Sequence, residues 1–179
     1  MYNRISIVGG SGSGKSTLCD ILAKELKLPA IHIDAINFNK NWEEIDKEER
    51  DKIISAKALE DKRIIDGNYN KTLKERFNKA DLIIWLDYSS LMLLKGVLKR
   101  FIRLNNKERP EIPGCKERFD IKFLKYVLTY NKKKRPVIES YLKDIPQDKV
   151  LISKKQKDLN KWLKEFTHDE NILEGLKGK

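Results

Sequence analysis

The chain has 179 residues, 40% of them hydrophobic, and its 38 Lys and Arg against 27 Asp and Glu give a formal net charge of +11. No run approaches the roughly 18 apolar residues that a membrane-spanning helix needs, so the composition argues against an integral membrane protein. The first residues lack the layout of a secretory signal, and the two cysteines, Cys19 and Cys115, lack metal-ligand spacing. We therefore expect a cytoplasmic protein with free thiols.

The excess positive charge lies wholly in the second half of the chain. Residues 1–90 carry 15 basic and 15 acidic residues, whereas residues 91–179 carry 23 and 12. Such a field favours anionic partners, among them nucleotide phosphates and the nucleic-acid backbone. A solvated, lysine-rich surface accounts for the same composition, so charge alone does not choose between these interpretations.

Apolar runs of strand length alternate with helical patterns, which predicts an α/β fold with a parallel sheet. The predicted strands are 4–8, 30–34, 63–66, 81–86 and 149–152. The predicted helices are 15–26, 42–59, one opened by Asn70, 91–104, one capped by Asp120, a separate one opened by Pro136, and 155–166. Residues 105–118 are expected to form a loop because they contain Pro110, Pro113 and Gly114. The polar tail from Thr167 is expected to fray.

A glycine-rich stretch lies between the first predicted strand and the first predicted helix. Gly9-Gly-Ser-Gly-Ser-Gly14-Lys15-Ser16 fits the pattern G-x-x-x-x-G-K-[ST] in full. Glycines let the chain curl so that main-chain N–H groups point at phosphate oxygens, and the following helix adds its dipole. We expect ATP and Mg²⁺ here, with Lys15 reaching the β- and γ-phosphates and Ser16 binding the metal. The predicted ATP-binding residues are Gly9, Gly10, Ser11, Gly12, Ser13, Gly14, Lys15, Ser16 and Thr17.

Two acidic residues lie at the carboxyl ends of predicted strands. Ligands of open parallel sheets bind at this edge. Asp34 closes Ile31-His-Ile-Asp, and Asp66 closes Ile64-Ile-Asp. Either carboxylate can hold Mg²⁺ through water or accept a proton from an attacking hydroxyl. Asp66 is predicted to bind the metal through water and to line the acceptor site. Asp34 is predicted to contact the acceptor and, with Lys15, to be catalytic. Helix capping or turn formation is the alternative for both, and His32, which points away from Asp34 in a strand, is interpreted as structural.

The pattern resembles a known group of proteins beyond the phosphate loop. Four features follow the layout of adenylate-kinase-like small kinases. They are the phosphate loop, Asp34, Asp66-Gly67 and the stretch Ala80-Asp-Leu-Ile-Ile-Trp-Leu-Asp87. More closely, Ile64-Ile-Asp-Gly-Asn-Tyr69 and Gly114-Cys-Lys-Glu-Arg-Phe-Asp120 resemble the bacterial topology-modulation proteins of the FlaR-like branch, over roughly residues 4–164.

This resemblance implies a three-layer α/β/α P-loop NTPase, one domain over 1–179, with a five-stranded parallel sheet in the order 2-3-1-4-5. It also implies a helical acceptor arm near residues 36–62 and a lid near residues 105–135. Arginines before and within such lids contact the nucleotide and the transferred phosphate. The matching residues are Arg100 and Arg135 as catalytic, Arg103 as ATP-binding, and Arg109 and Arg118 in the lid.

The acceptor side departs from known patterns, because the arginine that grips a nucleoside monophosphate is absent after Asp66-Gly67. Phe38, Trp42, Gly67, Asn68 and Tyr69 are candidates for the acceptor pocket, although Phe38 and Trp42 could equally pack the arm onto the core. We expect an ATP-dependent phosphotransferase with a small-molecule or nucleotide acceptor. A nucleotide-dependent, DNA-associated protein with non-specific nucleic-acid contacts is the alternative, and a plain NTPase is a third possibility.

Overall fold

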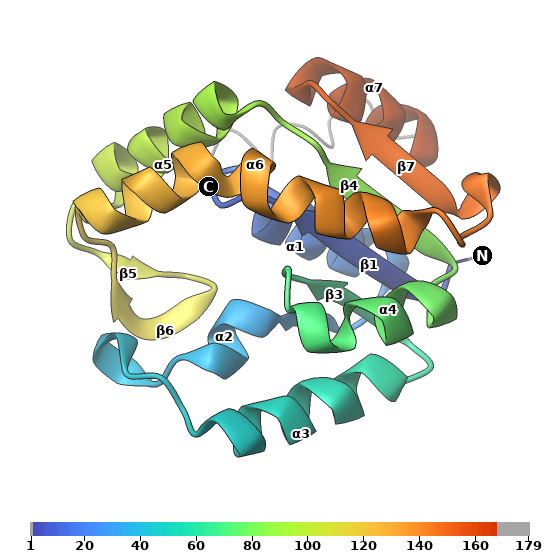
Figure 1. Cartoon of the computed structure of the whole chain (residues 1–179), viewed down its shortest axis with the longest axis horizontal. Helices are drawn as coiled ribbons and strands as arrows, with labels where there is room; N and C mark the ends of the chain where they lie inside the picture. The colour runs from blue at the N-terminus through green and yellow to red at the C-terminus, as the bar shows by residue number, and fades with distance from the viewer. Residues whose placement is uncertain (1, 168–179) are drawn as a thin grey trace.

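The computed structural model describes residues 2–167, so the predicted frayed tail lies outside the described residues. Five parallel strands form one sheet in the order β2-β3-β1-β4-β7, which confirms the predicted fold class and strand order. The strands are β1 (Arg4–Gly9), β2 (Ala30–His32), β3 (Arg63–Asp66), β4 (Leu82–Leu86) and β7 (Val150–Ser153). Their carboxyl ends meet at one edge of the sheet, where the chain places its loops (Figure 1).

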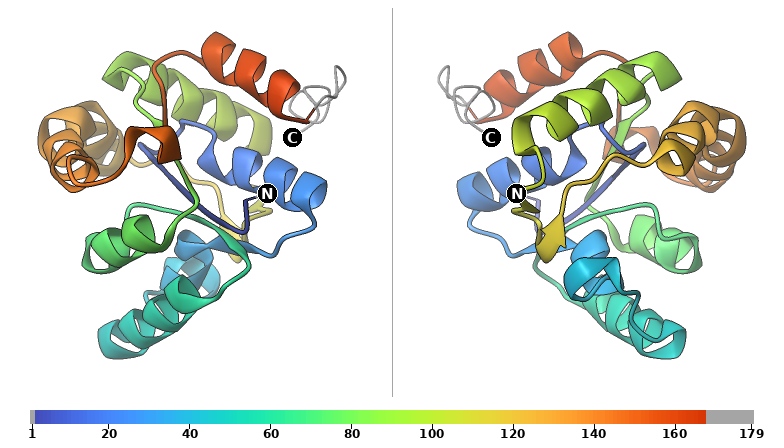
Figure 2. Two further views of the ribbon diagram at one scale, coloured as in Figure 1. Left: turned by 90° about the vertical axis from the view of Figure 1, so that its right-hand side faces the viewer. Right: turned by 90° about the vertical axis from the view of Figure 1, so that its left-hand side faces the viewer.

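Helices cover both faces of the sheet, as the two side views show (Figure 2). On one face α1 (Lys15–Leu26), α5 (Ser90–Leu104) and α7 (Gln156–Thr167) bury their apolar sides against β1 and β4. On the other face α4 (Asn70–Lys79) packs against the same strands, and α3 (Lys47–Leu59) covers β2 and β3. Because helices lie on both sides, β3 and β4 are buried along their whole length.

Strand β2 is shorter than predicted, and this changes the setting of Asp34. The strand pairs with β3 only as far as His32, opposite Asp66, and the chain then enters the short helix α2 (Ile33–Asn37). Ile33 turns into the core beside Gly67, where a side chain on the glycine would clash with it. Asp34 therefore lies in the first turn of a helix and not at the end of a strand, although it stays at the carboxyl edge of the sheet.

Helix α6 (Ile121–Leu142) is continuous through Pro136, so the prediction of a separate helix opened by this proline is wrong. The first half of α6 packs against α5 through Val127 and Tyr130, and the second half packs against α4 through Ile138 and Leu142. Burial on both sides of the proline holds the helix together even though Pro136 cannot donate a main-chain hydrogen bond.

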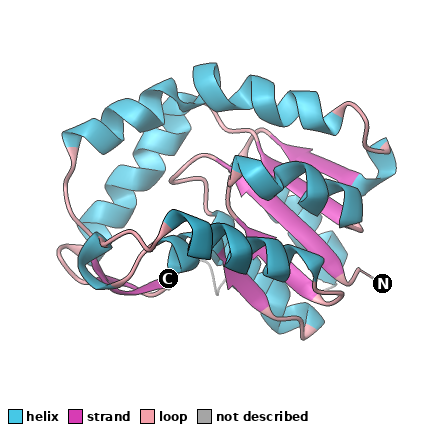
Figure 3. Ribbon diagram, turned by 60° about the horizontal axis from the view of Figure 1, so that its bottom comes forward, coloured by secondary structure: helices cyan, strands magenta, loops and turns pink. Residues whose placement is uncertain are grey.

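The predicted loop at 105–118 contains a β-hairpin made of β5 (Glu108–Arg109) and β6 (Ile112–Lys116). Its apolar residues Ile112 and Cys115 are buried, and the hairpin contacts the 3₁₀ turn η1 (Lys40–Trp42). Figure 3 shows the hairpin apart from the main sheet, on the side of its loop-bearing edge. Within residues 2–167, no helix is both long and apolar enough to cross a membrane.

The continuous helix makes Pro136 a position where stability can be gained. Its side chain is exposed, so Pro136→Ala removes little packing and restores a main-chain donor. Since proline is roughly 3 kcal/mol less favourable than alanine inside a helix, we expect the free energy of unfolding to rise by about 1–3 kcal/mol in urea titrations. Lys133→Ala, exposed on the same helix, should change it by less than about 0.5 kcal/mol. A loss of stability in Pro136→Ala would indicate that the proline is needed to start a new helix.

Candidate functional site

The glycine-rich loop between β1 and α1 has the backbone of a phosphate cradle. Gly12 and Gly14 have φ of +84° and +87°, which favour glycine over residues with side chains. Ser13 N donates to Gly10 O at 3.2 Å and closes the turn. The ammonium of Lys15 donates to the same carbonyl at 3.3 Å, so the cation already lies over the loop.

Helix α5 packs directly on this loop through two glycines. A Cβ on Gly96 would lie 2.0 Å from Gly12 O, and a Cβ on Gly12 would lie 2.3 Å from Leu93 O. No side chain fits at either position, so the loop and the helix touch backbone to backbone. Sequence analysis missed Gly96; its only signal was a lone glycine inside an apolar-periodic helix.

The turn after β3 supports the loop from the other side. The side-chain amide of Asn68 accepts from Gly9 N at 3.0 Å and donates to Gly9 O at 2.5 Å. Gly67 N donates to Ile7 O, and buried Arg76 donates from Nη2 to Gly67 O at 2.9 Å. Gly67 and Asn68, predicted to bind the acceptor, thus use these groups to hold the phosphate loop.

His32 and Asp66 form a buried pair beside the loop. His32 Nδ1 lies 3.2 Å from Asp66 Oδ1, and Nε2 lies 3.1 Å from Asp20 Oδ1 on α1. Burial opposes a charge on the ring, but hydrogen bonding with Asp66 and the charges of both carboxylates raise the pKa of His32 to about 9. The ring is therefore structural, as predicted, but it has a specific task, because it fixes the Asp66 carboxylate.

Asp66 also fits the role of a magnesium partner. Its Oδ2 is buried and has no hydrogen-bond partner among the described residues, so one carboxylate oxygen is left for a ligand or its water. No cluster of three His, Cys, Asp or Glu residues that could hold a metal occurs within 2–167. Mg²⁺ usually takes few protein ligands and keeps phosphate oxygens and waters. Ser16, at the start of α1, would offer its hydroxyl as predicted.

Asp34 lies at the carboxyl edge of the sheet, in the first turn of α2. The residue is exposed at the surface, but nearby protein atoms still displace water from its carboxyl, and this loss of water raises its pKa. The positive charge of Lys15 lowers the pKa most strongly, Asp66 raises it, and Arg109 and Arg100 lower it further. The structure thus brings together the acid, the loop lysine and two predicted arginines from separate elements.

These two arginines share one carboxylate that sequence analysis did not single out. Buried Glu117, which follows β6, accepts from Arg109 Nε at 2.6 Å and lies 2.9 Å from Arg100 Nε. Burial and the charge of Arg109 lower the pKa of Arg100. Glu117 belongs to the stretch Gly114–Asp120 that carries the family resemblance, but the stretch alone gave this acid no role.

The aromatic candidates of the arm contact the hairpin and one another. Phe38 and Trp42 meet edge to face, with ring centroids 5.3 Å apart. Trp42 Nε1 donates to Lys116 O at 2.8 Å, and the guanidinium carbons of Arg109 and Arg118 lie 4.6 and 5.8 Å from its ring centroid.

Two further candidates are occupied elsewhere. Tyr69 hydrogen-bonds with Asp51 and Arg50 on α3, away from the phosphate loop. Arg135, predicted as catalytic, pairs with Asp87 at 2.9 Å and Glu139 at 3.2 Å. Its catalytic role stays a prediction.

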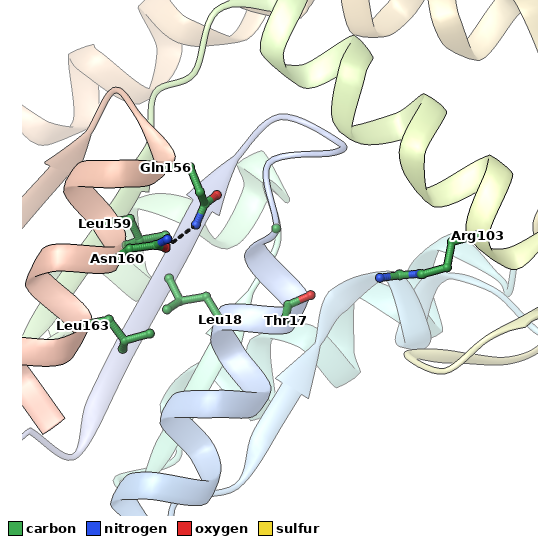
Figure 4. A pocket seen from close by; sticks show the side chains of 8 residues that line it. Thr17, Leu18, Arg103, Gln156, Leu159, Asn160 and Leu163 are labelled. Carbon is green, nitrogen blue, oxygen red and sulfur yellow. Dashed lines mark hydrogen bonds between the residues drawn. The ribbon is translucent and has the colours of Figure 1, made fainter. Parts of the chain in front are cut away.

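A pocket of about 260 Å³ opens beside the phosphate loop. Figure 4 shows Arg103 extending toward Thr17 on one side and the side chains of α7 on the other. Gln156 Nε2 donates to Asn160 Oδ1 at 2.9 Å, so two amides line the pocket next to apolar surface. The lining residues are Gly14, Thr17, Leu18, Arg103, Gln156, Leu159, Asn160 and Leu163. A flat, polar-edged ring adjoining the loop would fit this combination.

A family model described as ABC transporter matches residues 2–172, nearly the whole chain. The chain belongs to this family. As an ABC transporter family member it is a P-loop NTPase, and the predicted phosphate loop is confirmed as its nucleotide-binding element. No curated protein matches the sequence.

Solved structures similar to this family member include small kinases. Shikimate kinase from Bacteroides thetaiotaomicron aligns with a TM-score of 0.55 at 15% identity and covers 94% of this chain and 100% of that one. Shikimate kinase from Acinetobacter baumannii, in complex with shikimate, gives 0.57 at 18% identity and 94% of both chains. A protein from Chloroflexus aurantiacus described as a kinase candidate gives 0.51 at 15% identity, with 92% and 98% covered. At these identities the similarity establishes the fold alone.

The backbone contact at Gly96 predicts a cost for the smallest substitution. Alanine normally stabilises a helix relative to glycine by about 1 kcal/mol, but here its Cβ would overlap Gly12 O. We expect Gly96→Ala to weaken ATP binding at least about tenfold in calorimetry, because α5 and the loop must separate. Lys95→Ala, the neighbouring position, should bind ATP as the wild type does. Unchanged affinity in Gly96→Ala would mean that the loop tolerates the displacement.

The raised pKa of His32 predicts a pH-dependent contribution to stability. A charged ring paired with two carboxylates stabilises the fold fully below its ordinary pKa of about 6.5, and this contribution is lost as pH rises through about 9. The difference in unfolding free energy between wild type and His32→Asn should therefore be largest near pH 6. It should shrink by on the order of 2 kcal/mol by pH 10, measured by denaturant titration. A difference that stays constant across this range would contradict the pairing.

Proposed function

We propose that the chain is an ATP-dependent phosphotransferase that acts on a small molecule bearing a hydroxyl group. The observation that carries this proposal is the grouping around Asp34. Its carboxylate lies in the first turn of α2 at the carboxyl edge of the sheet, and the charges of the loop lysine Lys15 and of Arg100 and Arg109 act on it. A hydroxyl acceptor needs such a carboxylate, and a phosphate in transfer needs such cations.

Each part of ATP has a matching part of the chain. The amides of the glycine loop and the ammonium of Lys15 would bind the β- and γ-phosphates. The pocket between Arg103 and α7 would hold the purine, with its amides at the base edge. Mg²⁺, when bound through Ser16 and a water on Asp66, would neutralise charge on the phosphate oxygens.

The remaining residues would carry out the transfer. Asp34 would accept a hydrogen bond from the acceptor hydroxyl, orient its oxygen toward the γ-phosphate and take its proton. Arg100 and Arg109 would meet the charge that develops on the transferred group, since a guanidinium stays protonated and can bind two oxygens. The residues near 105–135 would serve as a lid, and their contact with η1 would keep water from the phosphate.

The acceptor is defined here by its chemistry. Shikimate belongs among the compounds to test because the Acinetobacter baumannii protein of this fold is described in complex with it. The finer resemblance to topology-modulation proteins, and with it the DNA-associated alternative, stays a prediction.

Transfer can be tested with γ-labelled ATP, Mg²⁺ and a panel of nucleosides, nucleotides, sugars, shikimate and other hydroxy acids. We expect label in one class of acceptor. Lys15→Ala should reduce transfer by about 10²-fold or more, because the phosphates lose their nearest cation. Lys24→Ala, exposed on the same helix, should transfer label as the wild type does. Phosphate release at an equal rate with and without every acceptor would indicate a plain NTPase and contradict the proposal.

A further inference from the structure

Glu117 is a buried acid held at the convergence of three elements. It is 2% exposed, and its N–H donates to Lys107 O at 2.9 Å, so its backbone is fixed by the hairpin segment. Its carboxylate takes two contacts from Arg109, Nε to Oε2 at 2.6 Å and Nη2 to Oε1 at 3.3 Å. The same Oε2 lies 2.9 Å from Nε of Arg100 on α5. One carboxylate thus joins α5 to the hairpin through two cations.

Two guanidinium groups this close repel each other unless an anion lies between them. Arg100 lies on α5 and Arg109 on β5, and the charges of both act on Asp34. The negative charge of Glu117 offsets the repulsion between the two guanidinium groups and holds both of them in place. Without its charge we expect the two side chains to separate and turn toward solvent.

Arg109 is held from a second direction by Trp42. Its guanidinium carbon lies 4.6 Å from the centroid of the indole ring, so the cation lies between a carboxylate and an aromatic face. The indole itself is fixed, because Nε1 donates to Lys116 O at 2.8 Å. The fluorescence of Trp42 therefore reports whether Arg109 is in place.

The contacts with Glu117 leave part of Arg100 for a ligand. Nε of Arg100 lies 2.9 Å from Glu117 Oε2 as an ion pair, but both Nε and Nη2 are buried without a hydrogen-bond partner of good geometry among residues 2–167. A buried donor without a partner is uncommon in folded proteins and calls for an acceptor supplied by something else. An oxygen of a phosphate bound next to Lys15 and Asp34 is such an acceptor.

We propose that Glu117 is a positioning residue of the transfer reaction: its buried carboxylate fixes Arg100 and Arg109 as a pair near Asp34 and Lys15. This inference rests on the proposed function. Glu117 itself touches neither nucleotide nor acceptor, and it acts by keeping the two guanidinium groups where the transferred phosphate meets them.

The test compares Glu117→Gln with Glu108→Gln, an exposed acid of the same hairpin whose replacement removes the same charge. Turnover of Mg-ATP is measured with the acceptor that the labelling experiment identifies. If no acceptor takes label, turnover is measured as the release of phosphate from ATP. We expect Glu117→Gln to lower kcat about 10- to 100-fold while KM and the calorimetric Kd for ATP stay within about threefold. Glu108→Gln should match the wild type in all three.

A second measurement needs no turnover. The emission of Trp42 is obtained as the difference between wild type and Trp42→Phe, each with and without Glu117→Gln. We expect Glu117→Gln to raise acrylamide quenching of this emission, because Arg109 leaves the indole. If the wild type neither hydrolyses nor transfers phosphate, the proposed function fails, whereas the fluorescence result still tests whether Glu117 holds Arg109.

Three results would overturn the proposal. Wild-type kcat in Glu117→Gln is one, and unchanged quenching of Trp42 is another. The third is an equal loss of kcat and ATP affinity together with a lower Tm, which would show that Glu117 only stabilises the fold. If Glu117→Gln does not fold, Glu117→Asp replaces it in the test. Aspartate keeps the negative charge, but its side chain is one methylene shorter, so the carboxylate lies farther from the two arginines. This variant should lower kcat at unchanged ATP affinity, and a wild-type kcat there also refutes the proposal.

Discussion

The contact between Gly12 and Gly96 sets the separation of the phosphate loop from α5, and the rest of the site follows from that separation. Arg100 and Arg103 lie four and seven residues after Gly96, so all three share the helix face that meets the loop. The charge of Arg100 acts on Asp34, and Arg103 lines the pocket beside α1. One backbone contact therefore helps to place both arginines on the side of α5 that faces the phosphate loop.

Three buried or half-enclosed carboxylates surround the loop, and their partners give them different roles. Asp66 is bound by His32, and Glu117 is paired with two arginines. Asp34 makes no such pair among the described residues, and the loss of water around its carboxyl raises its pKa. Under the proposed function, Asp34 is the one of these three acids that would exchange a proton with an acceptor, since the others already hold their partners.

The sequence was sufficient for the parts of the fold that depend on local pattern. The loop motif, the boundaries of α1 and β3 and the order of the strands follow from glycine spacing, apolar periodicity and family resemblance. Contacts between residues far apart in the chain could not be predicted from the sequence. Nothing near Asn68 or Glu117 along the chain shows that one binds Gly9 and the other joins two arginines. Pro136 misled for the same reason, because packing at both ends of α6 outweighs its local preference.

The join between η1 and the β5–β6 hairpin bears on the difference between transfer and hydrolysis under the proposed function. A transferase must keep water from the γ-phosphate, so the segments proposed to cover the loop would have to meet each other as well as the nucleotide. In this chain they meet at Trp42, which adopts a left-handed φ of +64°, next to Asn41 at +61°. Such conformations are strained for residues with bulky side chains and persist only where surrounding contacts compensate. Here the compensation comes from the hairpin: Lys116 O accepts from the indole, Cys115 Sγ accepts from Trp42 N at 3.4 Å, and Arg109 stacks on the ring. The strain and the contacts that offset it lie at the same junction, so η1 and the hairpin hold each other in place, as the proposed cover over the phosphate would require.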